Sequence, residues 1–368
     1  MKFIYENTNW PEFEWDSSRI LNLLSSVRNK QGILKGKTAS IGLDLQNEAL
    51  IENLSNDIIK SSEIEGEILD PEQVRSSLAR HLGIDYSGTA IPDRNVEGIV
   101  EMMLDATRNY SDPLTSERLF GWHSALFPTG RSGMFRITVG DWRKDEKGPM
   151  QVVSGPIGRE KIHYQAPPAE MLEKEMKRFF AWINGNKTSD EVIRSGIAHL
   201  WFVTLHPFDD GNGRIARAVT DMLLTRSDRT PNRYYSMSAQ ISRLRKSYYD
   251  ILERTQKGGL DITDWLEWFL QCLDKALDSA DRSLNSVLFK YNFWKDNSAL
   301  IINQRQKKML NMILDGIKGK LTTKKWAKIT KCSDDTALRD INDLIAKGIL
   351  IKDSPGGRST SYSLQSNS

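Results

Sequence analysis

The sequence predicts a mainly α-helical protein with one short β-hairpin near its middle and a separate module at its C-terminal end. Apolar residues recur at three- and four-residue steps over most of the chain, whereas strand-like runs are confined to two short regions. At 368 residues, with 39% apolar and 27% charged side chains, the chain is long enough for two or three domains.

The helical spacing begins at Leu50 and continues through Ile51, Leu54 and Ile58. It returns in four later stretches: Val96 to Tyr110, Val192 to Leu205, Ala218 to Leu224 and Ile262 to Leu273. Because such amphipathic helices bury their apolar faces against one another, we expect a helical core.

Residues 149–164 interrupt this pattern with two strand-like runs. Gln151-Val152-Val153 and Lys161-Ile162-His163-Tyr164 flank Ser154-Gly155-Pro156-Ile157-Gly158, where glycine and proline favour a turn. We therefore expect a hairpin upstream of the last three helical stretches.

Beyond residue 295 the pattern changes to three short helices followed by two strand-like runs. These runs are Gly348 to Lys352 and Ser361 to Leu364, around Pro355-Gly356-Gly357. This order is typical of a winged helix-turn-helix. We predict an N-terminal helical region over 1–85, a core over 86–290 and a winged helix-turn-helix domain over 300–366.

The composition narrows the class of protein. A net charge of +3 is too small, for the whole chain, to indicate nucleic-acid binding. The two cysteines, Cys272 and Cys332, have neither a metal-ligand spacing nor the number that a disulfide framework needs. No signal peptide is recognisable, and no run reaches the roughly 20 apolar residues that span a bilayer. We expect a cytoplasmic protein without a membrane partner.

One segment concentrates most of the chain's polar chemistry: His206-Pro207-Phe208-Asp209-Asp210-Gly211-Asn212-Gly213-Arg214-Ile215-Ala216-Arg217. Its glycines allow close approach to an anion, and a helix that starts near Arg214 would direct free amides at the same anion. Arg214 and Arg217 lie three residues apart on one side of that helix and suit two phosphates. Asp210 suits a magnesium ion that bridges phosphates, and a neutral His206 suits proton removal from a hydroxyl.

Two common nucleotide motifs are excluded for this segment. Gly211, Gly213 and Ala216 follow the spacing G-x-G-x-x-A, but a helical pattern precedes them where a dinucleotide fold needs a strand. The P-loop pattern G-x-x-x-x-G-K-[ST] does not occur. The combination favours in-line attack on a nucleotide phosphate.

The same segment resembles the signature H-x-F-x-[DE]-G-N-G-R-x-x-R of the Fic family, whose characteristic activity is transfer of AMP from ATP to a protein hydroxyl. The resemblance implies a Fic-type helical bundle with a β-hairpin flap, and a target protein docked along residues 151–164 by strand addition. It assigns roles to the residues of the segment: His206 as base, Phe208 as core anchor, Asp210 as the Mg²⁺ ligand, Gly211, Asn212 and Gly213 as anion hole, and Arg214 and Arg217 as phosphate ligands. Gly213 favours AMP transfer over phosphorylation, because the Doc-like kinases carry lysine there.

A downstream pair, Tyr249 and Gln256, lies two helical turns apart on one face. In the family a tyrosine and an asparagine at these places contact adenosine, so Tyr249 is implied as an ATP ligand. Gln256 departs from the family pattern, and we expect Tyr248 to pack in the core.

The helix that begins near Leu50 carries a carboxylate in its apolar stripe. Leu54 and Ile58 continue at helical steps to Ser61 and Glu65, and burying a charge requires a cation beside it. The alternative is a helix that ends near Gly66 with Glu65 in water. Ser61, Glu65 and Gly66 also resemble the inhibitory motif [ST]-x-x-x-E-[GN] of self-regulating Fic proteins. This implies that Glu65 pairs with Arg217 and displaces the γ-phosphate of ATP, leaving the protein nearly silent.

The C-terminal module is basic, with 13 Lys or Arg against 6 Asp from Leu300 onward. A basic module suggests nucleic acid, but the expected recognition helix carries Asp334, Asp335, Asp340 and Asp343, which would repel DNA phosphates. Homodimerisation or target docking therefore stands beside DNA binding.

The predicted function is an autoinhibited protein adenylyltransferase that uses ATP and Mg²⁺ and modifies Ser, Thr or Tyr hydroxyls, its own included. Three alternatives stay open: a nucleotide-sensing DNA-binding regulator, an enzyme that removes AMP with a water oriented by Glu65, and a metal-dependent hydrolase. The hydrolase would use His199, His206 and Asp210, and five histidines in the chain are few for such a site.

Overall fold

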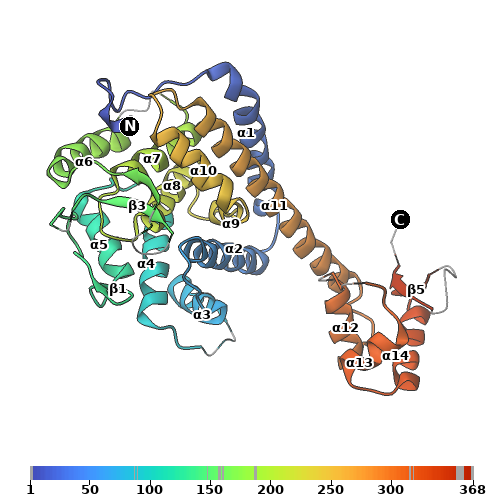
Figure 1. The fold of residues 1–368 in the computed structure, drawn as a ribbon. Helices are drawn as coiled ribbons and strands as arrows, with labels where there is room; N and C mark the ends of the chain where they lie inside the picture. The colour runs from blue at the N-terminus through green and yellow to red at the C-terminus, as the bar shows by residue number, and fades with distance from the viewer. Residues whose placement is uncertain are drawn as a thin grey trace. The chain divides into compact units, whose positions relative to one another are not determined.

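The computed structural model describes residues 3–86, 88, 90–146, 148–155, 159, 161–185, 189–314, 316–317, 319–353 and 360–365. The chain divides into two compact units, Met1–Asp281 and Arg282–Ser368 (Figure 1). The segments expected as N-terminal region and core thus share the first unit, apart from residues 282–290. As domain boundaries, residues 85 and 290 stay predictions.

Unit 1 is mainly helical, as the sequence predicts. Its helices are η1 (Ile4–Glu6), α1 (Ser17–Ala39), α2 (Leu43–Ile64), α3 (Pro71–Leu82), α4 (Arg94–Arg108), α5 (Ser116–Leu126), α6 (Ala169–Asn184), α7 (Glu191–Leu205), α8 (Asn212–Asp228), α9 (Met237–Arg243), α10 (Arg245–Gln256) and α11 (Thr263–Asp296), which ends in unit 2. Three observed helices are longer than the sequence pattern suggested, since α2 begins at Leu43 rather than near Leu50. The stretch 218–224 belongs to α8, which starts in the central motif, and the stretch 262–273 is only the beginning of α11.

Helices α7 and α8 form the centre of unit 1 (Figure 1). Every residue of α7 from Val192 to Leu205 is buried, and most of α8 is buried as well. Gly196 brings α7 close to α11, because a Cβ atom there would lie 3.1 Å from side-chain carbons of Leu266 and Phe269. The loop between α7 and α8 carries the central motif, so the motif is held by the most deeply buried helices of the unit.

Two antiparallel hairpins accompany the helices of unit 1. Strands β3 (Gln151–Ser154) and β4 (Lys161–Gln165) pair as the sequence predicts, with Val152 opposite Tyr164 and an irregularity before Val153. Residues 156–158 of the expected turn lie outside the described residues. The second hairpin, β1 (Arg131–Ser132) with β2 (Phe135–Arg136), has no counterpart in the sequence predictions.

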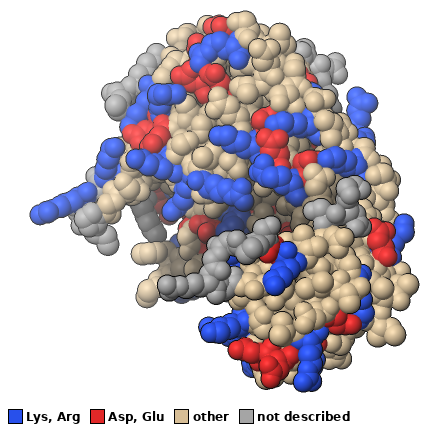
Figure 2. Space-filling view, turned by 90° about the vertical axis from the view of Figure 1, so that its right-hand side faces the viewer, with Lys and Arg blue, Asp and Glu red and all other residues tan. Residues whose placement is uncertain are grey.

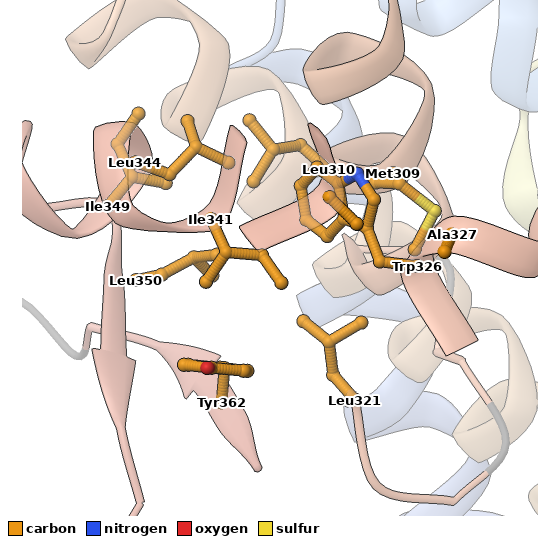
Figure 3. Packing of buried hydrophobic residues seen from close by; sticks show 11 residues of the cluster. Met309, Leu310, Leu321, Trp326, Ala327, Ile341, Leu344, Ile349, Leu350 and Tyr362 are labelled. Carbon is orange, nitrogen blue, oxygen red and sulfur yellow. The ribbon is translucent and has the colours of Figure 1, made fainter. Parts of the chain in front are cut away.

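Unit 2 contains α12 (Gln304–Leu314), α13 (Thr323–Thr330), α14 (Asp334–Ala346) and the antiparallel strands β5 (Leu350–Lys352) and β6 (Tyr362–Leu364). The order of three helices and two strands agrees with the prediction, while Pro355, Gly356 and Gly357 lie outside the described residues. Trp326 is fully buried and packs among Met309, Leu310 and other apolar side chains (Figure 3). Unit 2 therefore has a hydrophobic core of its own.

Charged side chains of both signs are interspersed on the face shown in Figure 2. Within the described ranges, no helix combines the length and apolar composition needed to cross a bilayer.

Candidate functional site

The central motif forms the tight connection between α7 and α8. His206 closes α7 in the left-handed region, at φ 49°, and its amide donates to the Phe202 carbonyl at 3.0 Å. Gly211, at φ 80°, turns the chain into α8, and a Cβ there would lie 2.9 Å from the Phe127 ring. The Asn212 side chain bridges the loop, since its Oδ1 accepts from Phe208 N at 3.0 Å and its Nδ2 donates to Phe208 O at 2.8 Å. Hydrogen bonds and the two left-handed residues thus fix the backbone of the loop at both ends.

Phe208 fixes the middle of this loop in the core. Its side chain is fully buried, and its ring stacks on the His123 imidazole with centroids 4.2 Å apart. Trp142 and Phe202 lie around the same ring. Aromatic packing of this kind contributes large apolar burial together with a defined geometry, so Phe208 anchors the loop as a core residue.

His206 has the protonation state and orientation of a general base. Desolvation by burial lowers the pKa of His206 to about 4, so its imidazole is neutral near pH 7. The Nδ1 atom lies 3.3 Å from the Val203 carbonyl. Because a carbonyl only accepts, Nδ1 carries the proton and Nε2 keeps a free lone pair. The guanidinium of Arg143 donates to the His206 carbonyl at 2.7 Å, which holds the backbone of the residue.

His123 supports the acidic part of the loop. Its Nδ1 accepts from Gly140 N at 3.4 Å, which leaves Nε2 to donate to the Asp210 carbonyl at 3.2 Å. Burial lowers the pKa of His123 to about 4, and the ring is therefore neutral. Asp209 accepts from Thr138 N at 2.8 Å. Neighbouring segments thus hold both backbone and side chains around Asp210.

Asp210 is the candidate magnesium ligand. Its Oδ1 accepts from Gly211 N at 2.6 Å, and its Oδ2 accepts from the Ser132 hydroxyl on β1. An ionised carboxylate has about four lone-pair positions, so acceptor capacity remains for a cation. One carboxylate beside a phosphate site is the kind of donor set that Mg²⁺ uses together with water and phosphate oxygens. The residues present fit the ion.

Both arginines of the motif are buried and contact the last turn of α2 or the residues that follow it. Arg217 donates from Nε to Ser61 Oγ at 2.8 Å, and from Nη2 to Ser61 O at 2.9 Å and Glu65 Oε1 at 2.8 Å. Arg214 donates from Nη1 to Glu67 Oε2 at 2.7 Å and lies over the Phe127 ring. The predicted pairing of Glu65 with Arg217 is observed.

Each arginine also has a nitrogen without a partner. Arg217 Nη1 and Arg214 Nε are buried and make no hydrogen bond within the described residues. Buried donors of charged groups are costly when unsatisfied. The two atoms therefore fit an anionic ligand such as a nucleotide phosphate.

The end of α2 explains why glycine follows Glu65. The helix ends at Ile64, one residue before the carboxylate, and Gly66 adopts φ +87°. Gly66 N donates to Glu63 O and Glu67 N donates to Ser62 O, both at 3.0 Å. This is a Schellman arrangement, in which glycine accepts the left-handed conformation at little cost. The helix ends near Gly66, as one sequence interpretation expected, but Glu65 faces Arg217 and its side chain is only 33% exposed.

Glu65 lies directly over the first turn of α8. A Cβ atom at Gly213 would be 2.2 Å from Glu65 Oε1 and 3.2 Å from Arg217 Nη1. The carboxylate thus fills the space above a glycine at a helix N-terminus, where an anion is favoured by free amides and the helix dipole.

The side chains of α10 differ in exposure, and Tyr248 packs in the core as the sequence predicted. Tyr248 is buried, and its hydroxyl lies 2.7 Å from His199 Nε2. Tyr249 is 38% exposed and lies under the Arg245 guanidinium. Gln256 is buried and donates to the Val203 carbonyl at 3.4 Å, beside the end of α7. The pair expected on one face therefore differs in environment, and only Tyr249 is open to a ligand.

The metal-hydrolase interpretation is wrong in its ligand set. His199 is buried with Nδ1 at 2.9 Å from Thr220 Oγ1 and Nε2 at 2.7 Å from Tyr248. Both ring nitrogens are therefore engaged. Across the described part of the chain, the only three-residue group with metal-ligand spacing is His81, Glu97 and Glu101, which shares no member with the proposed set.

Four residues of the site were missed by sequence reasoning. His123, Ser132 and Arg143 reach the loop from segments more than 60 positions away and carry no local motif. Glu67 lies two residues after Glu65, and a charged residue beyond a helix end is normally solvated. Only the tertiary structure brings these four to the motif.

Comparisons with known proteins place this site in a family. Residues 113–224 match the Fic/DOC family, and residues 3–84 match a domain of unknown function, DUF4172. A protein adenylyltransferase Fic from Culex quinquefasciatus is 28% identical over 239 residues, which is 63% of this chain and 42% of that protein. The protein adenylyltransferase fic-1 of Caenorhabditis elegans is 28% identical over 171 residues, 46% of this chain and 31% of that protein. The chain thus matches less than half the length of these relatives.

Solved structures show the same fold. A Fic family protein from Desulfovibrio desulfuricans has a TM-score of 0.52 at 20% identity, covering 95% of this chain and 97% of that one. A Fic domain containing signaling protein from Bacteroides thetaiotaomicron has a TM-score of 0.50 at 19% identity, with 73% and 97% covered. Residues 113–224 therefore match the Fic/DOC family, and the chain is distantly related to the protein adenylyltransferases Fic.

Proposed function

We propose that this protein transfers AMP from ATP to a hydroxyl group of a protein and that Glu65 inhibits the reaction. The observation that carries the proposal is the arrangement at the α7–α8 loop. A neutral histidine with a free Nε2 lies at one end of the loop, and a glycine-lined helix N-terminus with two buried arginines lies at the other.

In the proposed reaction the acceptor hydroxyl oxygen attacks the α-phosphorus of ATP, while His206 Nε2 takes the hydroxyl proton. A bond forms between the acceptor oxygen and phosphorus, and the bond from phosphorus to the bridging oxygen breaks, so that pyrophosphate leaves. Arg214, Arg217 and the amides at the start of α8 bind and orient the phosphates. Asp210 would hold Mg²⁺, which neutralises phosphate charge when bound.

The hairpin of β3 and β4 supports a peptide target. Val153 and Ile162 pair across the two strands and are 47% and 48% exposed. Exposed apolar side chains on a short sheet suit an added strand from another protein. We propose that the modified segment docks along residues 151–164.

Inhibition follows from the position of Glu65. Its carboxylate occupies the space over Gly213 and holds Arg217, so a phosphate at the same place would meet a negative charge. The wild-type protein should therefore transfer AMP slowly.

The test is intact-mass spectrometry of the protein after incubation with ATP and Mg²⁺. Glu65→Gly should add AMP to the protein, wild type should add little, and Glu65→Gly combined with His206→Ala should add none. Removal of a general base and its positioning typically costs 10²–10⁴-fold. Glu63→Gly is the matched control, because Glu63 lies at the same helix end and pairs with Lys60 instead. Equal modification in Glu65→Gly and wild type would exclude the inhibitory role.

A second candidate reaction is removal of AMP from a modified protein. Burial lowers the pKa of His206, and the charge of Glu65 opposes part of that effect. In this candidate reaction Glu65 would orient the water that removes AMP. AMP release from a pre-modified target should then require Glu65, whereas AMP transfer should increase without it.

Unit 2 leaves DNA binding as a further candidate. Asp340 is buried and accepts from Arg305 and Asn303, and Asp343 accepts from Gln306 at 2.7 Å. Two of the four carboxylates expected to repel DNA are therefore engaged inside the unit. Salt-dependent binding of duplex DNA that is insensitive to His206→Ala would support the regulator interpretation. Its absence would favour docking of a protein.

A further inference from the structure

The segment after α2 holds both arginines of the motif, and it does so with two different carboxylates. Glu65 binds Arg217 at 2.8 Å and Glu67 binds Arg214 at 2.7 Å. The Schellman turn at Gly66 places the two side chains on the same surface of α8, one on each arginine. Glu67 thus has the same relation to Arg214 that Glu65 has to Arg217.

The two arginines depend on these carboxylates to different degrees. Besides its contact with Glu65, Arg217 donates two hydrogen bonds to Ser61. For the Arg214 guanidinium, the hydrogen bonds found among the described residues go to Glu67 alone, and Nε has no partner. Loss of Glu67 therefore leaves the Arg214 guanidinium without a hydrogen-bond partner among the described residues, whereas Arg217 still has Ser61 within reach.

The body of α2 is anchored independently of this segment. Asp57 is fully buried, pairs with Arg233 at 3.1 Å, and accepts from the backbone of Ser238 at 3.1 Å. The Glu67 side chain, in contrast, is 35% exposed. Residues 65–67 can consequently leave the arginines while α2 keeps its packing.

We propose that Glu67 is a second inhibitory carboxylate, which competes with a phosphate group of the nucleotide for Arg214. Only the expected effect on the rate of AMP transfer rests on the proposed function, whereas the effect on phosphate binding does not. With two carboxylates on two arginines, a ligand must bring two anionic groups to displace both. Ligands with several phosphates should therefore be affected by Glu67 more than ligands with one.

Binding of ATP, inorganic pyrophosphate and AMP to wild type, Glu67→Gln, Glu65→Gly and the double variant, measured by isothermal titration calorimetry, tests the proposal. Glu67→Gln should tighten ATP and pyrophosphate binding about three- to fivefold, the upper part of the range expected for a partly exposed ion pair, and should leave AMP within about twofold. The double variant should bind ATP more tightly than Glu65→Gly. Glu63→Gln is the matched control and should change nothing.

Two outcomes separate this proposal from the proposed function. If Glu67→Gln binds ATP more tightly but the double variant transfers no AMP, Glu67 still competes with phosphate for Arg214, and the proposed transferase activity is wrong. AMP transfer by Glu65→Gly with ATP binding unchanged by Glu67→Gln, and no gain in the double variant, would overturn the role of Glu67. A circular dichroism spectrum identical to wild type for Glu67→Gln excludes misfolding as a cause.

Discussion

The loop 206–217 and the segment 61–67 meet at the same arginines, but they are held in place in different ways. The loop is fixed from several sides: Phe208 is fully buried, Asn212 closes the backbone, and Arg143 and His123 bind the carbonyls of His206 and Asp210. The carboxylates of Glu65 and Glu67, which we propose to be inhibitory, are each about one-third exposed and follow a helix end.

Because of this difference, we expect the contacts of the loop to determine the stability of the site and the ion pairs of residues 65–67 to affect its activity. Contacts that fix the loop are buried and cooperative, so their loss should damage both folding and catalysis. Ion pairs that are partly exposed contribute little to folding. We therefore expect that residues 65–67 can be displaced at small cost while the loop 206–217 keeps its geometry.

The largest expected effect comes from removing the anchor of the loop. Phe208→Ala should lower the free energy of unfolding by about 3–5 kcal/mol, because a fully buried aromatic ring is replaced by a cavity. In the Glu65→Gly background it should also abolish AMP transfer, since the loop loses its position. Urea unfolding and initial rates measure the two effects.

Phe269→Ala provides the comparison, because Phe269 is equally buried but packs between α11 and α7, away from the loop. It should cost similar stability with a smaller loss of rate. Equal losses of rate in both variants would mean that the loop has no special dependence on Phe208.

Lowering the pH should reduce the folding stability of the region around the α7–α8 loop, because its histidines are buried. Burial lowers the pKa of His199 from its ordinary 6.5 to about 3, so between these values the proton binds only in the unfolded state. Stability is therefore fully present above pH 6.5 and is lost as the pH falls through that window. From pH 7 to pH 5 the contribution of His199 should fall by roughly 2 kcal/mol.

Urea unfolding at pH 7, 6 and 5 measures this loss. His199→Gln removes the titrating group. It should reduce the slope of the unfolding free energy against pH by an amount that corresponds to at most one proton. An unchanged slope would show that His199 is not the group responsible. His123 and His206 share the depressed pKa and should account for part of the remaining slope.

The loop could be recognised in the sequence because its candidate site residues are contiguous. His206 to Arg217 needs no tertiary information to be recognised, and Glu65 was found because a charge interrupts an apolar stripe. The supporting residues were not predictable in this way. Ser132 and Arg143 are ordinary polar residues until folding brings them to Asp210 and His206.

The same contrast applies to the helices and strands: some are recognisable from their own sequence, and others depend on tertiary contacts. Apolar spacing located α2, α4, α7, α8 and the start of α11, but α6 was missed although its buried residues recur at helical steps. Helix α11 also continues to Asp296, through residues in which charged and apolar side chains are mixed. Hairpin β1–β2 has two residues in each strand, too few for an alternation to be recognised. Short elements are defined by their partners more than by their own sequence.

The smallest expected effect concerns the turn that aims both inhibitory carboxylates. Gly66→Ala introduces no clash, because nothing lies within 4 Å of the new Cβ, but φ +87° is strained for alanine. A strain of about 1 kcal/mol should loosen residues 65–67 and raise the rate of AMP transfer about fivefold. Gly42→Ala is the matched control at the other end of α2, where φ is −62° and space is also open. It should leave the rate unchanged. A rate increase in both variants would mean that α2 as a whole has shifted, and the turn at Gly66 would then have no particular role in inhibition.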